Sequence, residues 1–347
     1  MEVSILVVAA QNPRVRYLFD EVGRQAKVSY LEFLPTPEHQ LAVTGTLPDQ
    51  FYQRVDAQFG NPDVIVFPWP QLAPLAEKFS RAVRVYYCKD PFEYWTCWNR
   101  DEIHRLESRM LGICDAVFAV SRQLAEEFVP RTRGKVFYLP NATEQSFLDA
   151  APMPRPGNLP AGKPVLGAVG QINDTCDWDF IADLAANLPE ARLCFVGGLE
   201  EENPDRLRKI AADLVGKFDI HFLGPQPHEN LPAFMQHFDI SLCLLKPGGY
   251  ADRRCPLRLY DYLTTPRPII STAIREAREH LPYIHIAENG REAAKLARGI
   301  LSGEFAVDVA ARRKYVERQT WKIRAGELLG YLDRLLPELR EKKRVEQ

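Results

Sequence analysis

The stretch "RRCPLRLYDYLTTPRPIIST", residues 253–272, contains the start of a helix and a following strand. Pro256 suits the first turn of a helix, where its missing N–H costs no hydrogen bond. The run "RPIIST" (267–272) has the β-branched composition of a buried strand, and "DISLCLL" (239–245) is a similar run upstream. Strand, helix and strand in this order predict a unit of a parallel sheet, because parallel neighbours need a crossover connection.

The same alternation continues along the whole chain. Nearly continuous apolar strands that alternate with helices predict parallel sheets covered on both faces. A proline-rich segment, 150–164, interrupts the series and has the composition of a linker. We therefore predict an α/β protein with two doubly wound, Rossmann-like domains that face a cleft, residues 1–152 and 153–318. The predicted strands are 4–10, 27–33, 63–68, 83–88, 115–121 and 135–140 before the linker, and 165–170, 191–198, 219–224, 239–245, 267–272 and 284–287 after it.

The composition argues against several classes of protein. The 347 residues carry a formal net charge of −2 and neither half is a basic arm, which argues against a nucleic-acid partner. The seven cysteines are odd in number and form no C-x-x-C, so neither a disulfide framework nor a zinc ribbon is expected. The histidines form no metal-binding pair. The apolar runs are too short for a membrane span or a signal peptide, and we expect a cytoplasmic protein.

Arg258 and Asp261 lie three residues apart and share one helical face. An arginine can bind a phosphate through two parallel hydrogen bonds, and the first-turn amides near Leu257 add to an anion site. An ionised aspartate accepts hydrogen bonds, such as those of a ribose diol. The pair therefore suits a nucleoside diphosphate. The alternative is an exposed Arg–Asp ion pair, which is worth roughly a few tenths of a kcal/mol.

Two loops at the expected carboxyl ends of strands carry further candidates for donor binding. In "VLGAVGQIND" (165–174), Gly167 and Gly170 let the backbone approach a ligand, and Gln171 supplies polar atoms. "LLKPGGYADRRCPLRL" (244–259) brings Lys246 and Arg254 in front of the helix. Ligands of open α/β sheets bind at this edge. A tight turn for the first loop and a basic solvent loop for the second are the alternatives.

The order of motifs over roughly 85–347 resembles the GT-B glycosyltransferases and is most similar to their retaining family 4. "CPLRLYDYLTTPRPIIST" (255–272) resembles that family's P-L-K-L-x-E-Y-L-A-x-G-K-P-V-V segment. "DAVFAVSRQLAEEF" (115–128) and "KVFYLPNATEQSFL" (135–148) are similar to its strand–Ser–helix and its P-N-G turn. "RQTWKIRAGELLGYL" (318–332) resembles its terminal helix, which implies that residues 319–347 return toward the first domain.

The resemblance implies roles at individual positions in the donor-binding half. Arg258 stands where the family has a diphosphate-binding lysine, and Asp261 stands where it has a ribose-binding glutamate. Arg253 occupies the position of a second acidic residue, and Asp252 beside it is the candidate substitute. Gly170 and Gln171 stand where the family has Gly-Arg, so one phosphate-binding charge is lost.

The first domain is expected to hold the acceptor. Asp90 lies just past a predicted strand in "YYCKDPFEYWTCWNRDE" (86–102), where related enzymes have an acidic residue near the reacting sugar. We take it, together with Arg258, as the candidate catalytic pair, with Asp90 either acting as a base toward the acceptor hydroxyl or positioning that hydroxyl. Tyr94, Trp95 and Trp98 are candidates for stacking on a sugar or contacting a lipid-linked acceptor. An Asp-Pro turn and an aromatic core or interface are the alternatives.

These residues and the resemblance imply a glycosyltransferase that moves a sugar from a UDP-sugar or GDP-sugar to a saccharide or glycolipid acceptor. The resemblance further implies retention of configuration, no metal or other cofactor, and a place in cell-surface polysaccharide synthesis, with peripheral membrane contact through the first domain. Two alternatives stay open: a non-catalytic sugar-nucleotide-binding or partner protein of the same fold, and a nucleotide-sugar epimerase. The residues do not indicate the oligomeric state.

Overall fold

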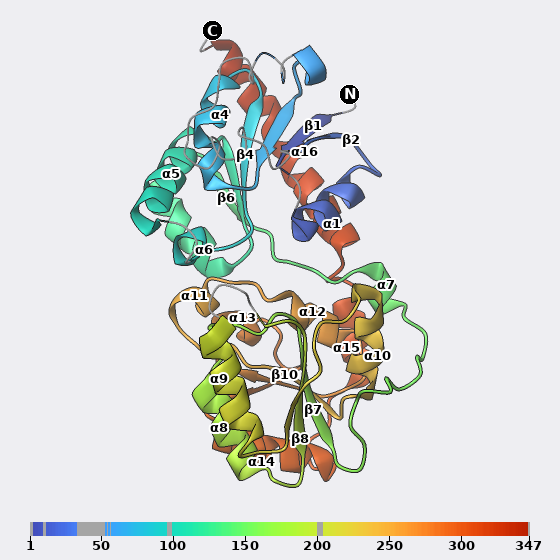
Figure 1. Ribbon diagram of the computed structural model, residues 1–347. Helices are drawn as coiled ribbons and strands as arrows, with labels where there is room; N and C mark the ends of the chain where they lie inside the picture. Colours follow the sequence, from blue (N-terminus) through green and yellow to red (C-terminus); the bar gives the residue numbers. More distant parts are fainter. Residues whose placement is uncertain are drawn as a thin grey trace. The chain divides into compact units, whose positions relative to one another are not determined.

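The computed structural model describes residues 3–9, 12–32, 53, 55, 57–95, 99–199 and 204–345. The chain divides into two compact units. The first consists of Met1–Asn141, Arg253–Cys255 and Trp321–Gln347, and the second of Ala142–Asp252 and Pro256–Thr320. Each unit is built around a parallel sheet of its own (Figure 1).

The first unit has a six-stranded sheet in the order β2-β1-β3-β4-β5-β6 (Figure 1). The chain moves outward from β1 in both directions, as in a doubly wound sheet. β3 and β5 are buried along their whole length, as expected for strands covered on both faces. The strands are β1 (Ser4–Val8), β2 (Lys27–Leu31), β3 (Val64–Phe67), β4 (Val83–Cys88), β5 (Ala116–Ala119) and β6 (Lys135–Tyr138). The helices are α1 (Pro13–Val22), η1 (Pro70–Leu72), α4 (Ala73–Lys78), η2 (Phe92–Tyr94), α5 (Arg100–Ile113), α6 (Arg122–Phe128), η3 (Val129–Arg131) and α16 (Trp321–Val345).

The second unit repeats this architecture with the strand order β12-β11-β10-β7-β8-β9. Every strand pair in it is parallel. The strands are β7 (Val165–Val169), β8 (Arg192–Val196), β9 (Ile220–Phe222), β10 (Ile240–Cys243), β11 (Ile269–Thr272) and β12 (His285–Ala287). The helices are α7 (Gln145–Leu148), α8 (Trp178–Asn187), α9 (Pro204–Val215), η4 (His228–Asn230), α10 (Leu231–His237), α11 (Gly249–Asp252), α12 (Leu257–Leu263), α13 (Arg275–Arg278), α14 (Gly290–Leu301) and α15 (Val309–Val316).

Alternate side chains of the second sheet point into two separate cores. Leu166 and Ala168 of β7 join the core that α8 and α14 cover, whereas Val165 and Val169 join the core that α10 and α12 cover. Side chains of a strand point to opposite faces in turn, so both faces of β7 are apolar. The continuous apolar runs of the sequence reflect this two-sided burial.

The boundaries between the units fall at 141/142 and 320/321, whereas we expected 152/153 and 318/319. The stretch after residue 141 folds with the second unit because its backbone is bonded there. The Thr143 N–H donates to the Gln319 carbonyl at 2.9 Å, and Phe147 of α7 is buried in the second core. The second unit therefore begins at Ala142, before the proline-rich segment 150–164, and this segment lies within the second unit.

The terminal helix α16 groups with the first unit. Its Trp321 lies beside Tyr17 of α1, with ring centroids 6.0 Å apart. The three residues Arg253–Cys255 also group with the first unit, although the residues on either side of them in the chain belong to the second. Among the helices of the described ranges, none combines the length and the apolar character that a bilayer span requires.

Candidate functional site

Glycine turns follow the strands at the carboxyl edge of the second sheet. Gly170 directly follows β7 and has a φ of +106°, a conformation that L side chains rarely adopt. Its N–H donates to the Val196 carbonyl at 2.9 Å, which ties it to the end of β8. A Cβ on Gly197, the residue after β8, would overlap the Gly170 carbonyl oxygen. Gly170 and Gly197 therefore allow two backbone turns to lie against each other. The sequence analysis did not single out Gly197.

Gly167 has a different role from the one we expected. It lies inside β7, and a Cβ there would collide with the ring of Phe238, which is completely buried. Its missing side chain makes room for that ring in the core. Packing, not the approach of a ligand, accounts for this glycine, so we correct the expectation that it binds the donor.

Helix α12 is anchored to the same edge by a buried tyrosine. The Tyr262 hydroxyl accepts a hydrogen bond from the Val169 N–H at 2.8 Å and donates one to the Leu242 carbonyl at 3.1 Å. The ends of β7 and β10 are thus joined to the helix. Because Tyr262 faces the core, Arg258 and Asp261 fall on the less buried face of α12. Leu257, the first residue of the helix, is also partly exposed.

The Arg258 guanidinium lies over the Gly170 turn. A Cβ built on Gly170 would stand 2.9 Å from Arg258 Nη2, and Nη2 is 3.4 Å from the Gln171 carbonyl oxygen, which accepts a weak hydrogen bond. Three of the predicted donor-binding residues, Gly170, Gln171 and Arg258, are therefore neighbours. They combine a permanent cation with a backbone that has no side chain in front of it.

Asp261 has a partner of its own on the same face. The Thr143 hydroxyl donates to Asp261 Oδ1 at 2.8 Å. Burial raises the pKa of Asp261 to about 7, against the opposing effects of the Thr143 hydrogen bond and of His228. Within the described residues, Arg258 and Asp261 do not form an ion pair with each other. The arrangement is therefore not the simple Arg–Asp surface pair that the sequence left open.

A histidine and a glutamate beside Asp261 were missed by the sequence analysis. His228 Nε2 is 2.5 Å from Glu144 Oε1, and the imidazole stacks on Phe147 at a centroid distance of 4.8 Å. The hydrogen bond to Glu144 raises the pKa of His228. Glu144 closely follows the Pro140–Asn141 turn in the segment 135–148 that resembles the family's P-N-G turn. That turn is the one signal in the sequence that could have drawn attention to Glu144.

The loop after β10 places Lys246 and Asp252 differently. The Lys246 side chain is exposed, while its N–H donates to the Thr175 carbonyl at 2.9 Å. The Asp252 carboxylate accepts two backbone hydrogen bonds, from Gly248 N–H at 3.1 Å and from Arg275 N–H at 3.0 Å. Asp252 therefore holds the loop in shape. These contacts do not indicate the substitute acid that we expected at this position.

In the first unit, Asp90 lies two residues past β4 and is 1% exposed. It forms an ion pair with Arg14 of α1 and lies 3.6 Å from Arg254 Nε. Burial alone would raise the pKa of Asp90, but Arg14, Arg254 and Lys89 outweigh it and hold the pKa below its ordinary value. The carboxylate is therefore a paired, fixed charge, which does not favour the role of a proton-accepting base. Arg254, expected at the donor, contacts this carboxylate.

The aromatic residues after β4 form a cluster around a buried lysine. Trp95 packs against Trp69 and Phe92, with ring centroids 5.8 Å and 5.5 Å away. Lys89 is 0% exposed, and its Nζ lies 3.6 Å from the Trp69 ring centroid. Burial lowers the pKa of Lys89 to about 7. Trp95 therefore takes part in internal packing, the alternative that the sequence left open.

The other two aromatic candidates have different outcomes. The Tyr94 ring lies under the Arg253 guanidinium at 5.4 Å, and Trp98 lies outside the described residues. No group of three metal-ligating side chains is found in the part of the chain that the structure describes.

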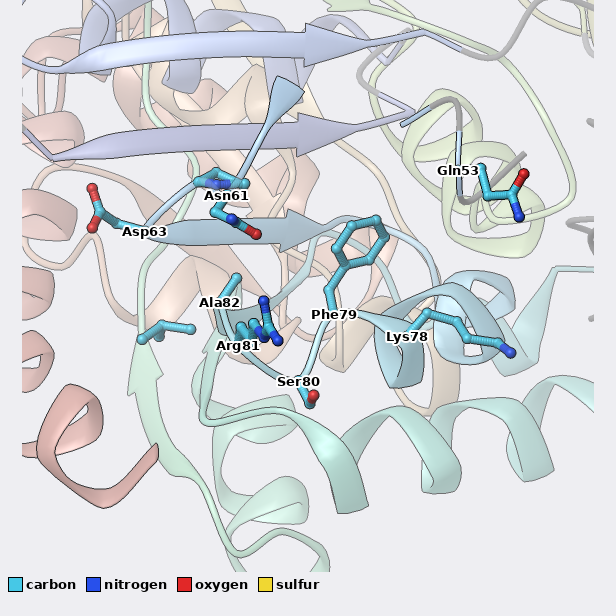
Figure 2. Close-up of a pocket in the computed structure, with 10 residues that line it drawn as sticks. Gln53, Asn61, Asp63, Lys78, Phe79, Ser80, Arg81 and Ala82 are labelled. Atoms are coloured by element: carbon cyan, nitrogen blue, oxygen red, sulfur yellow. The ribbon is translucent and has the colours of Figure 1, made fainter. Parts of the chain in front are cut away.

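A cavity of about 580 Å³ opens in the first unit at the amino ends of the strands, opposite to the carboxyl ends where ligands are expected. Figure 2 shows Asn61, Asp63, Phe79 and Arg81 around it, at the ends where β3 and β4 begin. Ligands of doubly wound sheets bind at the carboxyl ends of the strands. None of the predicted site residues lines the cavity. We therefore do not assign the functional site to it, in spite of its volume.

Two Rossmann-like domains, each with a six-stranded parallel sheet, define the GT-B fold of glycosyltransferases, and the chain has this fold. Among solved structures it is similar to HepE of Anabaena in complex with UDP and glucose, at a TM-score of 0.72 and 13% identity, covering 96% of this chain and 100% of that one. It is also similar to sucrose-phosphate synthase of Thermosynechococcus elongatus, at a TM-score of 0.73 and 14% identity, covering 97% and 100%.

One curated protein matches in sequence, the putative teichuronic acid biosynthesis glycosyltransferase TuaH of Bacillus subtilis (strain 168). The match is 23% identical over 238 residues and covers 63% of this chain. The chain spans 58% of the length of that relative. No protein-family model matches the chain.

Proposed function

We propose that the protein is a glycosyltransferase that takes a sugar from a nucleoside-diphosphate sugar. The observation that carries the proposal is the Arg258 guanidinium over the Gly170–Gln171 turn, with Asp261 on the same face of α12. This set has the parts that a nucleoside diphosphate requires: a cation and bare backbone for phosphate, and a carboxylate for ribose hydroxyls. HepE, which shares the fold, was crystallised with UDP and glucose.

The proposed chemistry is stabilisation of a departing diphosphate. Charge develops on the diphosphate as the bond to the sugar breaks, and preorganised donors lower the barrier by meeting that charge. In this proposal Arg258 is that donor, and Lys246 is a second cation on the neighbouring loop. Asp261, oriented by Thr143, accepts hydrogen bonds from the ribose. No metal or other cofactor is assigned a role.

The finer parts of the proposal concern the acceptor and the outcome. We infer transfer with retention to a saccharide or glycolipid, in the synthesis of a cell-surface polysaccharide. The name of TuaH, a putative glycosyltransferase of teichuronic acid biosynthesis, supports this setting. Asp90, held by Arg14 and Arg254, would contribute a fixed negative charge at the acceptor side.

One observation favours a second candidate, a non-catalytic sugar-nucleotide-binding protein of the same fold. Asp90, the carboxylate expected at the reacting sugar, lies in ion pairs with Arg14 and Arg254. Asp252, the carboxylate expected to replace the missing donor-site acid, accepts hydrogen bonds from backbone N–H groups. An epimerase would need free carboxylates around the sugar, and the same contacts argue against it.

A thermal-shift panel with UDP, GDP, CDP, dTDP and ADP tests the donor site. A ligand at 100 times its Kd stabilises the folded state by about 2.7 kcal/mol, which is a readily measured shift. We expect one nucleotide to stabilise the wild type and to lose its effect in Arg258→Ala. The matched control is Arg298→Ala, which removes an exposed arginine paired with Glu190 elsewhere in the same unit.

The sugar conjugate of the responding nucleotide then separates the two candidates. Release of the nucleoside diphosphate with a saccharide acceptor supports the transferase. Tight binding without release across acceptors supports the non-catalytic protein. If the wild type responds to no nucleotide, the donor-site interpretation of Arg258 and Asp261 is wrong.

A further inference from the structure

The tripeptide Arg253–Cys255 lies at an unusual place in the chain. Its three residues group with the first unit, whereas Asp252 before it and Pro256 after it group with the second. Helix α12, which carries Arg258, begins two residues after Cys255. Whatever fixes the tripeptide therefore also fixes the backbone that enters the proposed donor-binding helix.

Arg253 is fixed at both its side chain and its backbone. Its guanidinium forms a two-pronged ion pair with Glu127 of α6, with Nε 3.0 Å from Oε2 and Nη2 2.8 Å from Oε1. Its carbonyl accepts a hydrogen bond from the Ser121 hydroxyl at 2.8 Å. A parallel pair of this kind is specific in geometry as well as favourable, and lysine could not form it.

The next two residues have separate partners in the first unit. Arg254 Nε lies 3.6 Å from the buried Asp90 carboxylate. Cys255 is held by Asn141, whose side-chain amide donates to the Cys255 carbonyl at 2.6 Å and whose N–H lies 3.2 Å from the Cys255 sulfur. Each residue of the tripeptide is thus held by a different side chain of the first unit.

We propose that Arg253 and Glu127 act as positioning residues for the donor site, forming a clasp that fixes the backbone in front of α12. This inference rests on the proposed function, because it concerns how the nucleotide is bound. A segment that is already ordered loses less conformational freedom when a ligand binds, so preorganisation strengthens binding. It also gives a physical reason for an arginine where the resembled family has an acid: the side chain serves the clasp and not the sugar.

Charge reversal tests the clasp. Three variants are compared with the wild type: Arg253→Glu, Glu127→Arg, and the double variant in which the two charges are exchanged. UDP affinity is measured by calorimetry, and hydrogen exchange of residues 246–263 is measured without nucleotide. Each single variant is expected to weaken UDP binding roughly fivefold or more and to speed exchange in that segment, because two like charges then face each other; the double variant is expected to recover most of both.

The control is the same reversal at the exposed pair Arg109–Glu77, which belongs to the first unit but not to the clasp. It should change neither readout. If UDP binds the wild type and the single clasp variants match it in affinity and exchange, the clasp is refuted while the proposed function stands. If the wild type binds no UDP, the exchange data still decide the clasp, since faster exchange in the singles with recovery in the double does not depend on a nucleotide.

Discussion

Replacing Gly170 by alanine should damage stability and nucleotide binding together. The φ of +106° lies in a region that costs a residue with a Cβ about 1–3 kcal/mol. The added carbon would also stand 2.9 Å from Nη2 and 3.3 Å from Cζ of Arg258, so the guanidinium must move. A charge-assisted hydrogen bond contributes about 1.5–3 kcal/mol. We therefore expect the free energy of unfolding to fall by about 1–3 kcal/mol and UDP affinity to fall roughly tenfold to a hundredfold.

The matched control is Gly167→Ala, three residues earlier and inside β7. Its Cβ would collide with the buried Phe238 ring, and overpacking of this kind costs about 1–3 kcal/mol. The free energy of unfolding should fall by a similar amount, but the added carbon does not contact the Gly170 turn or Arg258. Urea denaturation gives the free energies of unfolding, and calorimetry well below the unfolding transition gives the UDP affinities of the folded variants.

The contrast between the two variants carries the test. Equal losses of UDP affinity would mean that general destabilisation explains the effect and that the Gly170 turn has no special place at the ligand. Unchanged UDP affinity in Gly170→Ala would contradict the apposition of Arg258 and the turn as the phosphate site. A loss in Gly170→Ala alone is what the geometry requires.

Three further changes probe buried charges. Asp261→Asn should leave the free energy of unfolding near pH 4 unchanged but raise it at pH 8 by about 2 kcal/mol, both without nucleotide. The folded-state pKa of about 7 lies above the ordinary 3.8, so the native carboxyl contributes stability at low pH that is lost as the pH rises from about 4 to 7. Equal urea midpoints at pH 8 would contradict this. Lys89→Met should raise the free energy of unfolding at pH 7 by about 2 kcal/mol. Because the folded-state pKa of Lys89 is lowered to about 7, the wild type should become more stable between about pH 7 and 10.5, and the variant should lack this rise. A series of urea denaturations over this pH range measures both effects. Arg312→Met should lower the free energy of unfolding by about 2–4 kcal/mol, since the buried guanidinium donates to the Thr265 and Arg267 carbonyls. If urea denaturation shows a decrease below about 1 kcal/mol, these hydrogen bonds contribute little to stability.

The strands of both sheets were predictable because parallel strands are buried on both faces. The run at 165–170 became β7 (Val165–Val169), and the run at 267–272 became β11 (Ile269–Thr272). A strand buried on both sides is largely apolar along its length, and that signal is local. The expected boundary at residue 152 differs from the observed one because it rested on composition alone. Long-range hydrogen bonds, such as those from the Thr143 N–H to the Gln319 carbonyl and from the Thr143 hydroxyl to Asp261, tie the preceding stretch to the second unit.

The parts of the site that depend on helix geometry were predictable from the sequence. The parts that depend on contacts with residues far away in the chain were not. Spacing alone put Arg258 and Asp261 on one face of α12. Spacing could not show that Thr143, 118 residues away in the chain, supplies the hydroxyl that orients Asp261. It also could not separate Gly167 from Gly170. Both glycines fall within the run 165–170 that was predicted as a strand. The position of the Phe238 ring beside Gly167 and the positive φ of Gly170 distinguish packing from ligand approach.

Arg253 shows why a position in a motif does not determine a role. The spacing to Asp261 places Arg253 where the resembled family has an acid, and by charge alone an arginine cannot take the role of that acid. The side chain is instead oriented by Glu127, 126 residues earlier, through two contacts of 3.0 Å and 2.8 Å. An acid at residue 253 would face Glu127 and repel it. The arginine and the glutamate therefore depend on each other, and the exchanged pair should work where either single reversal does not.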